Sequence, residues 1–219
     1  MQLKPTIFLC DDNREVLDSL SFHLQQAEFE ARAYPSGESL LQAINAEPKP
    51  LRAIFVLDIK NPPMDGDVIH DHLIEMGYTK RSPVIFLTGE GTIELAVAAV
   101  RKGALDFLRK PHTPDALLPL LHRAVELEAE WLIRANRCDF LRSIWTGLAP
   151  QKKKVAKLTA ESLSIGEISR RLGIVESTVE KHRQAVFESF GVDKATGVAT
   201  TIAAMKHCGI DVDSEDPGS

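Results

Sequence analysis

Acidic, hydroxyl and basic side chains follow several apolar runs in the first half of the chain. Asp11 and Asp12 come directly after one run, and Asp58 ends the next long one. Thr88 and Lys110 close two later runs. If these runs are parallel strands, their carboxyl ends lie at one edge of a sheet, where ligands bind. We therefore expect the five side chains to gather at a single site.

The three aspartates indicate a cation site that supports phosphoryl chemistry. Carboxylates held close together cannot all stay ionised without a cation, and oxygen ligands without a histidine cluster favour Mg²⁺. Beside such a cation, the Asp58 carboxylate can attack a phosphoryl group and become an aspartyl phosphate. Lys110 would stabilise the charge of the transferred group, and Thr88 would offer it a hydroxyl donor. A lone Asp58 would instead be a turn residue, but the four strand ends together favour the site.

The apolar runs alternate with segments of helical periodicity. The runs at 6–10, 53–57 and 83–89 are typical of strands buried on both faces of a parallel sheet, and 30–34 and 105–110 are weaker candidates. The helical segments lie at 14–27, 36–44, 93–104 and 114–135. This alternation predicts an α/β domain with a doubly wound, five-stranded parallel sheet.

Composition describes an ordinary globular protein. The 219 residues, 44% of them hydrophobic, suit one large domain or two small ones. No apolar run is long enough to cross a bilayer, and the first residues reach acid too early for a signal peptide. We therefore expect a cytoplasmic protein with no membrane partner. Cys10, Cys138 and Cys208 are far apart and odd in number, so we expect reduced, buried thiols, with Cys208 the one that could lie at the surface.

Charge is distributed unevenly, which predicts two domains with different partners. Residues 1–124 hold 13 Lys and Arg against 17 Asp and Glu, whereas residues 141–207 hold 11 against 6. The basic part shows helical patterns joined by short turns, and its expected helices lie at 151–161, 164–173, 176–191 and 194–209. Residues 210–219 are acidic and poor in apolar residues, and we expect them to be disordered.

Two short helices joined at Gly173 form a helix-turn-helix pattern, "SRRLGIVESTVEKHR". Val179, Val186 and Phe187 are spaced to pack inward. A plain helical bundle and an RNA-binding surface are the alternatives, but a helix-turn-helix favours duplex DNA. The second helix carries donors for phosphates and base edges, namely Ser177, Thr178, Lys181, His182, Arg183 and Gln184.

Residues 119–140 keep a helical pattern without a glycine or a turn cluster. Apolar residues follow a rough heptad, but Glu128 falls on the seam. Two interpretations remain open. The segment is a linker helix that pairs with a partner helix, or it is a terminal helix packed only on its own sheet.

These segments together resemble bacterial two-component response regulators of the FixJ/NarL type over nearly the full length of the chain. The resemblance lies in "LCDDN", "LDIKNPPMDG", "FLTG" and "DFLRKP". "GEISRRLGI" and "STVEKHR" resemble the LuxR-type DNA-binding domain. The resemblance implies a flavodoxin-like receiver domain at 1–124, a helical linker at 125–145, and a four-helix helix-turn-helix domain at 146–209.

The resemblance also implies roles for individual residues at the acidic site. A sensor histidine kinase would phosphorylate Asp58. Mg²⁺ would be held by Asp12, Asp58 and the backbone carbonyl of Lys60, with Asp11 in support. The protein would act as a switch and not as an enzyme.

The same resemblance implies how phosphorylation would be transmitted. Thr88, Phe107 and Lys110 would form the switch, and a cis peptide would precede Pro111. Phosphorylation would promote a homodimer through residues 93–103 and 105–109. The homodimer would bind double-stranded DNA and contact RNA polymerase to regulate transcription.

Several residues depart from the family pattern, among them Ser162 and Ile165, which stand where the family often has Gly and Asn. Asn61 stands where the family often has Met, and we expect little effect. Val175 stands where Ser or Thr usually caps the recognition helix. Lys60 and Glu90 flank Asp58 and Thr88, and we hypothesise that they pair across the site; two solvated charges are the alternative.

Two other functions compete with this one. Haloacid-dehalogenase-type phosphatases also use an aspartate nucleophile with Mg²⁺, but they need a second aspartate at the position of Lys60. A pseudo-receiver that is never phosphorylated would regulate DNA binding independently of a kinase. The complete set of Asp11, Asp12, Asp58, Thr88 and Lys110 argues against it.

Overall fold

The chain folds into two compact units, Met1–Ile133 and Arg134–Ser219, in a computed structural model that describes residues 4–48, 51–89, 93–110 and 114–214. The first unit contains a five-stranded sheet of order β2-β1-β3-β4-β5, in which every pairing is parallel. This confirms the predicted doubly wound sheet. The strands are β1 (Thr6–Cys10), β2 (Ala31–Tyr34), β3 (Ala53–Asp58), β4 (Val84–Thr88) and β5 (Asp106–Arg109).

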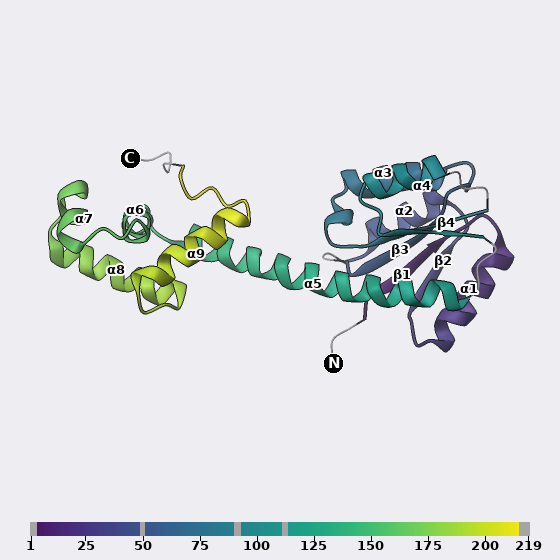
Figure 1. Ribbon diagram of the computed structural model, residues 1–219, viewed down its shortest axis with the longest axis horizontal. Helices are drawn as coiled ribbons and strands as arrows, with labels where there is room; N and C mark the ends of the chain where they lie inside the picture. Colours follow the sequence, from purple (N-terminus) through teal and green to yellow (C-terminus); the bar gives the residue numbers. More distant parts are fainter. Residues whose placement is uncertain (1–3, 49–50, 90–92, 111–113, 215–219) are drawn as a thin grey trace. The chain divides into compact units, whose positions relative to one another are not determined.

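Helices cover both faces of this sheet (Figure 1). One face carries α2 (Gly37–Ala46), α3 (Gly66–Glu75) and α4 (Ile93–Arg101), and the other carries α1 (Arg14–Gln26) and α5 (Pro114–Gly147). Alternate strand residues divide between two cores: Phe8, Phe55 and Phe86 face the first group, and Ile7, Ile54 and Ile85 face the second. The strands are therefore buried on both sides, as their continuous apolar runs predicted.

The helix α3 has no counterpart among the helices expected from the sequence. Its buried face consists of Gly66, Ile69, His70 and Leu73. A histidine and a glycine on this face break the apolar period that identifies a helix. The helix was missed for that reason, although it begins only eight residues after Asp58.

The long helix α5 uses its first part to cover the sheet. Leu117, Leu121 and Ala124 are buried against the strands. Glu128 continues this spacing and is only 2% exposed. The Arg52 guanidinium donates two hydrogen bonds to the Glu128 carboxylate, at 2.9 and 2.5 Å. The acidic residue on the apolar seam is therefore paired within its own unit, and this stretch of α5 packs on its own sheet.

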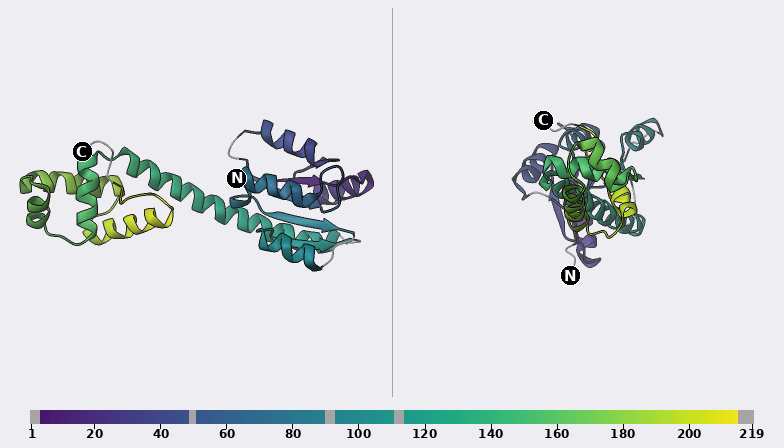
Figure 2. Two further views of the ribbon diagram at one scale, coloured as in Figure 1. Left: turned by 90° about the horizontal axis from the view of Figure 1, so that it is seen from above. Right: turned by 90° about the vertical axis from the view of Figure 1, so that its left-hand side faces the viewer.

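The second unit is helical (Figure 2). Leu141 and Trp145 of α5, and Leu148 just after it, form a core with residues of α6, α8 and α9. Ser164 and Glu167 form the predicted capping box at the start of α7, and Gly173 ends that helix with a positive φ of 66°. The helices are α6 (Pro150–Ala160), α7 (Ile165–Leu172), α8 (Glu176–Phe190) and α9 (Ala195–His207).

Two features of this unit differ from the sequence-based expectations. Cys138 and Cys208 form a disulfide, so the expectation of three reduced thiols is wrong for this pair, while Cys10 is free and buried. Ile210 and Val212 of the acidic tail are buried in the helical core, because two apolar residues suffice to anchor its start. Residues 215–219 lie outside the described residues. In the ranges that the structure describes, no helix combines the length and apolarity needed to cross a membrane.

Candidate functional site

The carboxyl ends of the central strands bring three aspartates together. Asp11 and Asp12 follow β1, and Asp58 is the last residue of β3. Cys10 pairs with Leu57 across these strands, so the residues that follow are neighbours. One oxygen from each of the three carboxylates lies within 4.8 Å of the others. Asp11 and Asp58 are buried, whereas Asp12 is exposed and open to solvent.

Lys110, which follows β5, bridges the two buried aspartates. Its Nζ lies 2.5 Å from Asp11 Oδ2 and 3.1 Å from Asp58 Oδ2. Burial disfavours the Lys110 ammonium, but its bonds to Asp11 and Asp58 outweigh burial and raise the pKa of Lys110. Burial raises the pKa of Asp58, against the opposing effect of Lys110. One ammonium among three carboxylates leaves an excess of negative charge that a cation would neutralise.

The donor set fits a hard divalent cation. Asp58 Oδ1 is buried and has no hydrogen-bond partner among the described residues. A buried carboxylate oxygen without a partner is costly, unless a ligand completes its coordination. Oxygen donors are also those that Mg²⁺ prefers. The three carboxylates and the unpartnered oxygen of Asp58 therefore fit a hard divalent cation.

The loop after Asp58 is held by buried contacts. Asn61 is fully buried, and its Nδ2 donates to Cys10 Sγ at 3.3 Å and to the Met64 carbonyl at 3.4 Å. The expectation that Asn61 matters little did not anticipate these bonds. Burial raises the pKa of Cys10 to about 12, so this thiol stays neutral. The bond between Pro62 and Pro63 is cis.

Gly66 brings the start of α3 directly against the end of β3. Its amide donates to the Ile59 carbonyl at 2.9 Å. A Cβ at this position would lie 2.3 Å from the carbonyl oxygen of Asp58. Only glycine permits this approach, which fixes the loop around Asp58.

The switch candidates lie on the two strands beside the acidic cluster. Thr88 is buried at the end of β4, and its carbonyl accepts a bond of 2.6 Å from the Lys110 amide. Phe107 of β5 is half-buried and packs against the core under α2, α3 and α4. Pro111, whose peptide was expected to be cis, lies outside the described residues.

Lys60 has a partner other than the one hypothesised from the sequence. Its side chain is exposed, and Nζ lies 3.2 Å from Asp65 Oδ2. Glu90, the hypothesised partner, lies outside the described residues. Asp65 also accepts a hydrogen bond from the backbone N–H of Asn61 at 3.3 Å. The described contacts of Lys60 therefore stay within its own loop.

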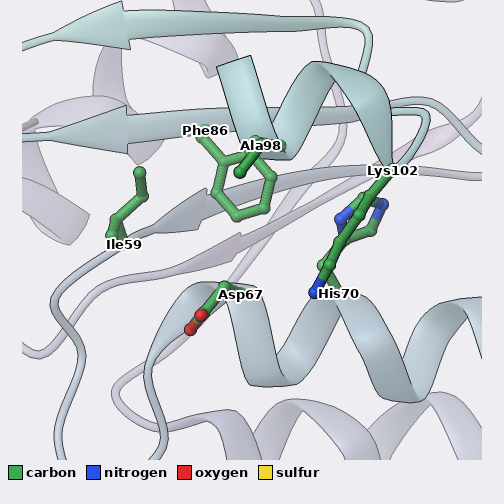
Figure 3. A pocket seen from close by; sticks show the side chains of 7 residues that line it. Ile59, Asp67, His70, Phe86, Ala98 and Lys102 are labelled. Atoms are coloured by element: carbon green, nitrogen blue, oxygen red, sulfur yellow. The ribbon is translucent and has the colours of Figure 1, made fainter. Parts of the chain in front are cut away.

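A small cavity between α3 and α4 contains a histidine that the sequence did not single out (Figure 3). Its volume is about 50 Å³, and Ile59 and Phe86 line it on the side of the sheet. His70 is fully buried, and neither ring nitrogen has a hydrogen-bond partner among the described residues. Burial lowers the pKa of His70, with Asp71 opposing and Lys102 adding to the shift. His70 is therefore neutral near pH 7.

The helix α8 presents a polar face in the second unit. Val179 and Val186 are fully buried, and Phe187 packs against the core, as their spacing predicted. The N-cap residue Val175 is 66% exposed and makes no side-chain cap bond. The start of α8 is therefore formed without a side-chain cap.

The six polar residues predicted to contact DNA divide into two groups along α8. Arg183 lies over the Phe187 ring, with its guanidinium carbon 5.7 Å from the ring centroid. Gln184 donates to Glu188 at 3.2 Å. The exposed group has the spacing of one helix face and consists of Ser177, Lys181 and Gln184, while the half-buried group consists of Thr178, His182 and Arg183.

Sequence comparison identifies the first unit. The model of the family "Response regulator receiver domain" matches residues 7–122, more than half of the chain. The chain belongs to the response regulators. Its match spans all five strands, from β1 to the first turns of α5.

Named relatives of this response regulator cover both units. It is 31% identical to the tetrathionate response regulatory protein TtrR of Salmonella typhimurium, over 84% of each chain. It is 29% identical to the transcriptional regulatory protein TdiR of Thauera aromatica, over 93% of this chain and 88% of the relative. The solved structure of the response regulator StyR superposes with a TM-score of 0.82 at 28% identity, covering 92% of this chain and 99% of StyR.

Proposed function

We propose that this response regulator is a phosphorylation-switched transcription regulator in which Asp58 accepts a phosphoryl group from a sensor histidine kinase. The observation that carries the proposal is the partnerless, buried Oδ1 of Asp58 beside Asp11, Asp12 and Lys110. An aspartate oxygen attacks phosphorus, the phosphorus–nitrogen bond to the kinase histidine breaks, and an aspartyl phosphate forms.

The acidic residues would hold Mg²⁺ during this transfer. Asp11, Asp12, Asp58 and the backbone carbonyl of Lys60 form the proposed ligand set, and the cation supplies charge neutralisation to the transferring phosphoryl group. Lys110 already contacts the Asp58 carboxylate and is placed to neutralise a phosphoryl oxygen attached to it. Lys60 occupies the place of a phosphatase acid/base, and its ammonium pairs with Asp65, which supports a switch rather than a turnover enzyme.

The added charge would be transmitted through the strands beside Asp58. Thr88 lies at the end of β4 and can donate to a phosphoryl oxygen, and Phe107 lies on the neighbouring strand β5. Phosphorylation acts by adding charge and strong acceptors next to an element with two arrangements. Val97 and Val100 of α4 are 43% and 53% exposed, which supports a phosphorylation-dependent homodimer through α4 and β5.

The helical unit would act as a LuxR-type DNA-binding domain at 146–209, connected to the receiver at 1–124 by the linker at 125–145. The exposed Ser177, Lys181 and Gln184 face of α8 would enter the major groove of double-stranded DNA, with Thr178, His182 and Arg183 at its flanks. The excess of Lys and Arg in residues 141–207 supports an anionic partner. RNA polymerase is the further partner of a cytoplasmic transcription regulator.

Intact mass measurement tests the phosphoacceptor directly. The full chain is incubated with acetyl phosphate and Mg²⁺, in parallel with Asp58→Asn and with a chelated sample. One phosphoryl group on the wild type alone, and none after chelation, is the expected result. A wild-type protein that binds Mg²⁺ but never gains mass would overturn phosphorylation and favour a regulator with an inert receiver domain.

A further inference from the structure

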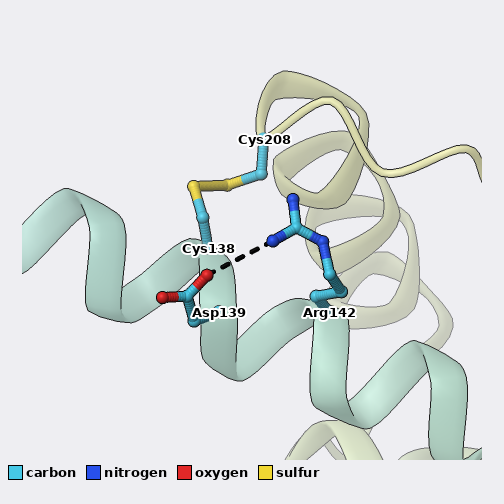
Figure 4. Close-up of a disulfide and its surroundings, with 4 residues drawn as sticks. All are labelled: Cys138, Asp139, Arg142 and Cys208. Carbon is cyan, nitrogen blue, oxygen red and sulfur yellow. Dashed lines mark hydrogen bonds and ion pairs between the residues drawn. A yellow bond between two sulfur atoms is a disulfide. The ribbon is translucent and has the colours of Figure 1, made fainter. Parts of the chain in front are cut away.

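The disulfide of the second unit joins two helices at an accessible position. Cys138 lies within α5 and Cys208 is the C-cap of α9, and their Cα atoms are 5.4 Å apart although 70 residues separate them. Figure 4 shows the bond running from α5 to the end of α9. Both cysteines are half-buried rather than buried. The pair therefore lies nearer the surface than a disulfide inside a core, where exchange with small thiols is blocked.

The bond closes a loop that contains the whole helix-turn-helix. Helices α6, α7, α8 and α9 all lie between residues 138 and 208. Apolar contacts also join α5 to α9 independently of the disulfide, because Leu141 and Trp145 of α5 pack in one core with Val198 and Met205 of α9. The unit can therefore fold with the cysteines reduced, and the bond adds a covalent restraint on its unfolded state.

The third cysteine does not compete for this pairing. Cys10 belongs to the first unit and is 1% exposed. It lies beneath Asn61, whose amide bonds its sulfur. Thiol chemistry at the surface of this chain is therefore confined to Cys138 and Cys208.

We propose that Cys138 and Cys208 form a reversible thiol–disulfide modification site whose oxidation by a low-molecular-weight disulfide of the glutathione class stabilises the DNA-binding unit. This rests on the proposed function, because a DNA-binding regulator works in the cytoplasm, where permanent disulfides are rare and those that form are regulatory or transient. The site makes the unit's stability respond to the thiol–disulfide balance independently of Asp58.

The reaction is a balanced exchange of two electrons. The thiolate of one cysteine attacks a sulfur of glutathione disulfide, which releases one glutathione thiolate and leaves a mixed disulfide. The second cysteine thiolate attacks the protein-bound sulfur of that mixed disulfide and releases the second glutathione. The two protons of the cysteines end on the two glutathione molecules. Arg142 and Asp139, joined by an ion pair of 3.2 Å, lie near the bond (Figure 4).

A thiol titration of the full chain tests the site. The protein is equilibrated in buffers of varied ratio of reduced to oxidised glutathione, quenched in acid, alkylated and weighed intact. We expect two thiols to disappear together in one transition, in the wild type and in Cys10→Ala, and no internal bond in Cys138→Ala. A bond that survives excess reduced glutathione, or a pair that stays reduced in excess oxidised glutathione, would overturn the proposal.

The effect on the DNA-binding unit needs a second measurement. Calorimetry should show the transition of the helical unit at a lower temperature after reduction, with the receiver transition unmoved. A doubly substituted Cys138→Ala, Cys208→Ala chain should match the reduced wild type in every buffer. Equal transitions for reduced and oxidised wild type would refute the stabilising role.

DNA binding separates this proposal from the proposed function. With both forms phosphorylated by acetyl phosphate, only the oxidised protein should bind a random-sequence duplex at low salt between the two melting temperatures. If neither form binds at any temperature, the proposed DNA-binding function fails, while the thiol titration and the calorimetry still decide the redox site.

Discussion

Replacing Gly66 with alanine should slow phosphorylation at the proposed acceptor Asp58, although the change adds no atom to the Asp58 carboxylate. The added Cβ would lie 2.3 Å from the Asp58 carbonyl oxygen and 3.2 Å from the Ile59 Cα, and both atoms are backbone. Ordinary contact begins at 3.4 Å, so either α3 or the end of β3 must move by about 1 Å, a displacement that can cost about 10²-fold in rate. Overpacking of this kind also costs about 1–3 kcal/mol of stability.

The assay is the rate of phosphorylation by acetyl phosphate, measured alongside urea unfolding of the same protein. Gly89→Ala is the matched control, because Gly89 also follows a strand at this edge and an added Cβ would meet nothing within 4 Å. Its stability should stay within about 0.5 kcal/mol of wild type. A Gly66→Ala protein that is phosphorylated as fast as Gly89→Ala would refute the argument that the close approach positions Asp58.

Three further predictions concern stability. In a urea titration, Arg52→Ala should destabilise the receiver by about 3–5 kcal/mol, because it leaves the buried Glu128 carboxylate without its guanidinium partner. The control Arg123→Ala loses only an exposed 3.9 Å contact with Asp106 and should cost less than about 1 kcal/mol. His70→Leu should flatten the pH dependence of stability. Folding lowers the pKa of His70 from 6.5, so below that pH the unfolded chain takes up a proton that the folded chain does not. The contribution of His70 to stability is therefore full above pH 6.5 and falls below it, by up to about 1.4 kcal/mol per pH unit. This contribution is present in wild type only. Val175→Ser should add about 1 kcal/mol by capping α8 and raise the melting temperature of the helical unit; an unchanged or lower value would contradict the missing-cap interpretation.

Local patterns in the sequence determined the layout of this protein. Apolar runs at 6–10, 53–57 and 83–89 predicted doubly buried parallel strands, and the sheet contains them in that form. Because parallel strands share a direction, the polar residues after them had to meet at one edge, whatever the details of packing. The capping box of Ser164 and Glu167 was equally predictable, since its partners are three residues apart.

Tertiary structure alone decided the contacts between residues distant in sequence. Glu128 looked like a flaw in an apolar seam until the fold brought Arg52 to it across 76 residues. Cys138 and Cys208, 70 residues apart, showed no spacing that marks a disulfide, and only the packing of α9 on α5 brings them together. Asn61 reaches Cys10 across 51 residues. Sequence periodicity describes which face of an element is apolar, but the partner that each polar residue meets depends on how elements pack, and that choice is made by the whole fold.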